Sequence, residues 1–163
     1  MVLGLLGALT IQGCPPHDAR GGSRVTPGTA RASNADAELE RTVFELVNRH
    51  RHAGGLAPLA RDPRIADQAR RHSLAMADGR TPFGHDGFPA RVDALRRVMP
   101  CRRSAENVAS NKGHRDPAAE AVRGWLASRP HRENIEGPYG LTGIGVARSA
   151  AGEVFFTQLF IGN

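Results

Sequence analysis

The C-terminal part of the chain holds two β-rich segments, 143–148 and 154–161, joined by Ser149-Ala150-Ala151-Gly152. A turn sequence between two such segments is typical of a β-hairpin. Along 154–161 both sets of alternating side chains are largely apolar, so neither face of this strand suits water. The strand needs cover on both faces. The sequence therefore predicts an α/β fold in which a sheet lies between two helical layers.

The preceding residues supply helices for these layers within a chain of 163 residues, a length that fits one domain. Apolar residues recur at helical spacing after Asn34, Asp62-Pro63 and Asp116-Pro117, which suit helix N-caps and first turns. We expect helices over about 34–53, 63–78, 90–98 and 117–128.

The net charge of +6 does not indicate a nucleic-acid-binding protein. Of the 22 basic residues Lys112 is the only lysine, and the arginines are scattered along the chain. Nucleic-acid surfaces usually cluster basic residues with stacking aromatics between them. Here the aromatic residues lie mostly toward the C-terminus, where arginines are rare. We therefore expect no nucleic acid among the partners.

The first 14 residues predict export. Residues 1–13 (MVLGLLGALTIQG) are uncharged and mostly apolar, too short for a membrane span but suited to a signal peptide. Residues 11–14 resemble a bacterial lipobox, in which Cys14 would be acylated. Gln12 departs from the small residue usual there, so a cleaved secretory signal stays open as the alternative. We expect a signal peptide at 1–14, a flexible tether at 15–33 and a domain at 34–163.

Three residues are candidates for chemistry. His85 and His131 lie in short non-periodic stretches beside Gly or Pro, where sites are often built. Glu106 lies between them in a segment, 105–109, expected to be a loop or a helical turn. A carboxylate flanked by small apolar residues needs a partner if it is partly buried. His72, by contrast, shares an apolar helix stripe and is expected to be a hydrogen-bonded core histidine. Spacing alone does not show that the three candidates converge.

Eight short motifs occur in order along 36–163: LVNRHR at 46–51, GLAPL at 55–59, HSLAM at 72–76, GHDG at 84–87, ENVA at 106–109, WLASRPHRENI at 125–135, GIGVA at 143–147 and FTQLF at 156–160. Together they resemble the bacterial branch of the CAP superfamily, which comprises cysteine-rich secretory proteins, antigen 5 and pathogenesis-related proteins. Its domain is also called SCP. Each motif is weak by itself, but the ordered set is specific.

The resemblance implies a three-layer α-β-α sandwich with a mainly antiparallel central sheet and a cleft. It places His85, His131 and Glu106 in that cleft as a set that could bind zinc or another divalent cation. Many eukaryotic members carry a second glutamate after the tryptophan that matches Trp125, and this chain has Ala127 and Ser128 there. Glu120, before that tryptophan, is expected to be an exposed helix residue.

Two functions follow from the resemblance. The first is a secreted or envelope-tethered binding module, not an enzyme, whose cleft holds a lipid, glycan or peptide ligand. A lipid anchor at Cys14 would attach this module to the membrane. The alternative is a metal-assisted hydrolase, with a protease-like activity the usual suggestion.

Overall fold

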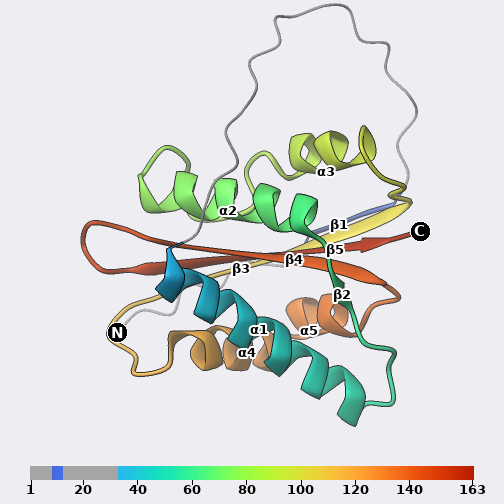
Figure 1. The fold of residues 1–163 in the computed structure, drawn as a ribbon, viewed down its shortest axis with the longest axis horizontal. Helices are drawn as coiled ribbons and strands as arrows, with labels where there is room; N and C mark the ends of the chain where they lie inside the picture. The colour runs from blue at the N-terminus through green and yellow to red at the C-terminus, as the bar shows by residue number, and fades with distance from the viewer. Residues whose placement is uncertain (1–8, 13–32) are drawn as a thin grey trace, which may run out of the picture.

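The computed structural model describes residues 9–12 and 33–163 and forms three layers (Figure 1). Helices α2 and α3 cover one face of a five-stranded sheet, and α1, α4 and α5 cover the other. The predicted α-β-α sandwich is therefore confirmed. The elements are β1 Leu9–Gln12, α1 Asn34–Ala53, β2 Ala60–Arg61, α2 Pro63–Ala77, α3 Phe88–Arg96, β3 Arg103–Asn111, α4 Pro117–Ala127, α5 Arg129–Glu136, β4 Leu141–Arg148 and β5 Val154–Gly162.

The sheet has the strand order β1-β3-β5-β4-β2 and is mixed but mainly antiparallel, as expected. Among the strands of the described residues, only the short β2 pairs in parallel, with β4. Strands β4 and β5 form the predicted hairpin, in which Gly152 adopts φ +79° and its N–H donates to Ser149 O at 2.9 Å. The central β5 is buried along its whole length, which explains its apolar sequence.

Alternate side chains of β5 enter two separate cores. Phe156 and Phe160 pack in the core beneath α1, α4 and α5, whereas Leu159 and Ile161 pack in the core beneath α2 and α3. This is the two-sided pattern that the sequence predicts.

Helix α2 lies very close to β4 because β4 carries glycine at two positions. A Cβ atom added at Gly143 would lie 2.2 Å from the Ala66 nitrogen, and one at Gly145 would lie 2.1 Å from the Arg70 nitrogen. Both contacts are to backbone atoms, which cannot rotate away. The absence of side chains at these two positions therefore allows the layer of α2 and α3 to approach the sheet this closely.

Two expected helix boundaries and one expected element need correction. Ser33, not Asn34, caps α1, since its hydroxyl accepts from the Asp36 N–H at 3.1 Å. Helix α3 starts at Phe88 instead of about residue 90. The segment 105–109 is not a loop but the middle of strand β3, where eight of nine residues are buried. A strand buried on both faces and built from small and polar residues shows no alternation, so its sequence hides it.

The N-terminal region is described only at Leu9–Gln12, which pairs antiparallel with β3 and sets Leu9 opposite Glu106. The predicted acylation site, Cys14, and all of the predicted tether at 15–33 except Ser33 lie outside the described residues. Across residues 9–12 and 33–163, none of the helices has the length and apolar character needed to span a bilayer.

We predict that Gly145→Ala lowers the free energy of unfolding by about 3 kcal/mol, because the added methyl group must displace α2 or the sheet. Urea unfolding of the full chain measures this value. Gly140→Ala is the matched control: a Cβ there meets nothing within 4 Å, and its effect should stay within about 0.5 kcal/mol. Equal effects of the two substitutions would contradict the packing argument.

Candidate functional site

Glu106 is the centre of the candidate site and is fully buried in the middle of β3. Its side chain points toward the α2–α3 layer, where the carboxylate meets two partners. His85 Nδ1 lies 2.9 Å from Oε1. Arg91 donates from Nε to Oε2 at 2.9 Å and from Nη2 to Oε1 at 2.8 Å. The structure thus gives this carboxylate the partner that its predicted burial requires.

Arg91 is a site residue that the sequence reasoning missed. Its guanidinium forms a two-pronged ion pair with Glu106, and the third nitrogen, Nη1, donates to Asp86 O at 2.8 Å. A signal was present in the sequence: Arg91 follows Phe88 by three residues, so both lie on one face of α3, and Phe88 is fully buried. A charged residue on the buried face of a helix calls for a buried partner.

The bond between His85 and Glu106 fixes the orientation of the imidazole. A carboxylate can only accept, so Nδ1 of His85 carries the hydrogen in this bond. The loop that holds His85 is fastened in turn by the bond from Arg91 to Asp86 O. His85 keeps 15% of its side chain exposed, so the ring lies at the boundary between the buried network and solvent.

His131 reaches the same strand from the opposite helical layer. It lies on α5, is buried, and its Nδ1 is hydrogen bonded to Ser128 Oγ at 2.7 Å. Asn107, the neighbour of Glu106, donates to His131 O at 3.1 Å. Asn134 on α5 donates to Asn107 Oδ1 at 3.0 Å and to Glu106 O at 3.3 Å. His85 and Glu106 are therefore joined by side chains, whereas α5 and His131 are joined to β3 through the asparagines.

The arrangement does not present Glu106 as a metal ligand. Both carboxylate oxygens are hydrogen bonded, one to Arg91 alone and one to Arg91 and His85. In the described parts of the chain, no three His, Cys, Asp or Glu side chains are grouped so that they could hold an ion. The donor set predicted from the resemblance therefore does not fit a divalent cation while Arg91 holds the carboxylate. Cation binding itself stays a prediction.

A cavity of about 210 Å³ adjoins this network and shares Arg91 with it. Its lining consists of Arg71, His72, Ala75, Thr81, Asp86 and Arg91. His72 is the predicted core histidine: it is buried and hydrogen bonded through Nε2 to Gly84 O at 2.7 Å. Five of these six lining residues carry polar side chains, and Ala75 is the apolar one.

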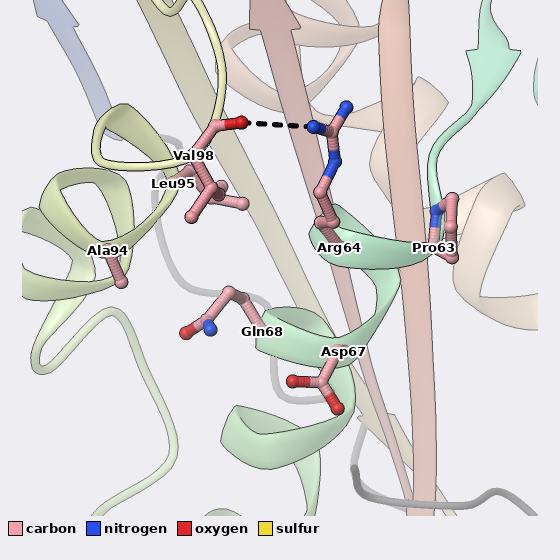
Figure 2. Close-up of a pocket in the computed structure, with 7 residues that line it drawn as sticks. All are labelled: Pro63, Arg64, Asp67, Gln68, Ala94, Leu95 and Val98. Atoms are coloured by element: carbon pink, nitrogen blue, oxygen red, sulfur yellow. Dashed lines mark hydrogen bonds between the residues drawn. The ribbon is translucent and has the colours of Figure 1, made fainter. Parts of the chain in front are cut away.

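A larger cavity, of about 330 Å³, lies elsewhere between α2 and α3. Figure 2 shows its lining, in which Arg64 donates to Val98 O at 3.0 Å beside Leu95. It contains none of the residues predicted to carry chemistry. We therefore place the candidate site at the Glu106 network and not at the larger cavity.

One further expectation needs correction. Glu120 on α4 is not an exposed helix residue, since only 11% of its side chain is accessible. Its carboxylate pairs with Arg123 and lies 3.6 Å from His114 Nδ1. The Arg123 hydrogen bond is the main cause that lowers the pKa of Glu120. Glu120 is thus occupied in a surface ion pair away from Glu106.

A sheet between two helical layers, with Glu106 on β3 paired to His85 and a second histidine on α5, is the arrangement that the resemblance to the CAP superfamily implies. The model of the cysteine-rich secretory protein family matches residues 44–160, and the chain belongs to this CAP family. It is 34% identical over 141 residues to the Bacillus subtilis protein YkwD, described as uncharacterized. That match covers 85% of this chain and 52% of YkwD, so the chain spans about half the length of this relative.

Solved structures show the same fold. An extracellular SCP-domain protein of Bacillus anthracis is 29% identical with a TM-score of 0.63, over 82% of this chain and 45% of that one. A cysteine-rich secretory protein of Staphylococcus aureus is 20% identical with a TM-score of 0.64, over 82% and 42%. The outer surface protein of Borrelia burgdorferi is 18% identical with a TM-score of 0.66, over 77% and 93%. The fold prediction and the family resemblance are both confirmed.

We predict that His72 makes stability depend on pH. Burial, with a smaller contribution from the Arg91 charge, lowers the pKa of His72 below its ordinary value of 6.5. Below about pH 6.5 the unfolded chain therefore binds a proton that the folded chain does not. As far as His72 determines it, the free energy of unfolding is therefore highest above about pH 6.5. It falls as the pH drops from there toward the lowered pKa, because protonation favours the unfolded chain.

Urea unfolding at pH 7.5 and pH 5 checks this prediction. His72→Gln should lose less stability between the two pH values than the unsubstituted chain does. His52→Gln, which removes an exposed imidazole at the end of α1, is the control for the loss of a histidine elsewhere in the chain. An identical pH dependence for His72→Gln and the unsubstituted chain would show that His72 does not cause it.

Proposed function

We propose that this chain is an exported CAP-domain binding module that holds part of an extracellular or envelope ligand in the cavity beside Arg91. Extracellular relatives of the same fold support export. An acyl group on Cys14 would tether the module to the membrane, and a cleaved signal would release it. The ligand classes in question are a lipid headgroup, a glycan and a peptide.

The observation that carries this proposal is the way Glu106 is used. Arg91 balances its charge, and both of its oxygens accept hydrogen bonds from Arg91 or His85. The carboxylate therefore has a structural role. A general base or a metal ligand needs an accessible lone pair. The network therefore favours binding over chemistry. The hydrolase alternative would need Glu106 in a role for which Arg91 competes.

The cavity itself suggests what part of a ligand it takes. Its volume of about 210 Å³ is below the usual range for a whole small molecule, so a side chain, a sugar or a headgroup fits better. Arg71, Arg91 and Thr81 bring hydrogen-bond donors to its lining, and Asp86 brings an acceptor. A polar group with an adjoining apolar part matches this lining.

The test is native mass spectrometry of the full chain purified from its own envelope or culture fraction. We expect a bound species on the unsubstituted chain and its loss from Ala75→Phe, because the ring would fill the cavity. Leu74→Phe is the matched control, since Leu74 is the adjacent residue of α2 and is 41% exposed. It should retain the bound species.

Two results would contradict the proposal. One is that the unsubstituted chain carries no bound species. The other is that Ala75→Phe retains it as well as Leu74→Phe does. Thermal unfolding of both variants verifies that the two comparisons are made on folded protein.

A further inference from the structure

The position of Arg91 in the network resembles that of a bound cation. Its guanidinium lies edge-on to the Glu106 carboxylate, with nitrogen–oxygen distances of 2.9 and 2.8 Å. Only 11% of the Arg91 side chain and none of the Glu106 side chain are exposed. A buried carboxylate needs one compensating positive charge, and the planar guanidinium fork matches its geometry.

A divalent cation would have to compete with this arrangement. To bind Glu106 it would either displace the guanidinium or lie within a few ångströms of it, where like charges repel strongly because little water screens them. Displacement would also break the bond from Arg91 Nη1 to Asp86 O, which fastens the loop of His85. The cost of metal binding therefore includes the cost of loosening the site.

With Arg91 in place, the same contacts do not make His85 and Glu106 two ligands of one metal ion. In metal sites a carboxylate that accepts from one imidazole nitrogen typically orients the ring and does not itself bind the ion. Glu106 has this relation to His85 Nδ1, at 2.9 Å. Once Arg91 no longer occupied the carboxylate, its second oxygen would become available beside an oriented imidazole.

We propose that Arg91 is a built-in counter-cation that keeps divalent metal away from Glu106, and that removing its charge lets Glu106 and His85 bind such an ion. The inference rests on the proposed function only in treating the cavity beside Arg91 as a binding site that works without a metal. It makes Arg91 the residue that decides between a metal-free and a metal-binding version of the Glu106 network.

The experiment is calorimetric titration of the full chain with zinc chloride, with native mass spectrometry to count bound ions. We expect Arg91→Met to bind zinc at least about tenfold more tightly than the unsubstituted chain. Arg91→Lys keeps a positive charge and should behave like the unsubstituted chain. Arg96, another arginine of α3, forms an ion pair with Asp93 at 3.1 Å. The control Arg96→Met should also leave zinc affinity unchanged.

The gain must come from the named residues. The double substitutions Arg91→Met with Glu106→Gln, and Arg91→Met with His85→Ala, should abolish it. Arg91→Gln is an uncharged second variant that can still bond a carboxylate oxygen; if Arg91→Met does not fold, Arg91→Gln is judged by the same criteria.

Three results would overturn the proposal: zinc binding by the unsubstituted chain as tight as by Arg91→Met, no gain in the uncharged variants, or a gain that survives Glu106→Gln. None of these results changes the ligand retention measured with Ala75→Phe. Failure of this inference and failure of the proposed function are therefore distinguishable.

Discussion

The buried charge of the Glu106 carboxylate is the constraint on which the α2–α3 side of the structure depends. It is fully buried in the middle of a strand, where an unpaired charge would be very costly. Arg91 from α3 supplies the compensating charge, and His85 from the preceding loop supplies a further hydrogen bond. Because Arg91 also holds Asp86 O, one buried charge determines where both the loop and the helix lie.

The next residue along β3 connects the sheet to the other helical layer, which α1, α4 and α5 form. Asn107 bonds to His131 O and to Asn134, which ties α5 to the strand. The far end of α5 is held by Arg51 of α1, whose Nη1 donates to Ile135 O at 2.7 Å and Gly137 O at 3.0 Å. Adjacent residues of one strand thus connect the sheet to both helical layers, and the candidate site lies where these connections meet.

The sequence predicted some of this and concealed the rest for physical reasons. The two-sided apolar pattern of 154–161 predicted the sandwich, and Asp62 and Asp116 predicted helix starts, because capping is a local effect.

Strand β3 was hidden, since a strand of small and polar residues buried on both faces has no periodicity. The pairing of His85 with Glu106 came only from the family resemblance, because contacts between distant residues leave no trace in spacing. Arg91 was overlooked among the many arginines, although its place on the buried face of α3 marked it.

A double-mutant cycle on Glu106 and Arg91 tests the central claim most directly. Glu106→Gln leaves a buried guanidinium without its charge partner and should cost about 3–5 kcal/mol in the free energy of unfolding, measured in urea. Adding Arg91→Met to that variant should cost much less than Arg91→Met does alone. We predict a coupling energy of about 2–3 kcal/mol between the two positions. A coupling energy within about 0.5 kcal/mol of zero would mean that the two residues act independently, and would contradict the account.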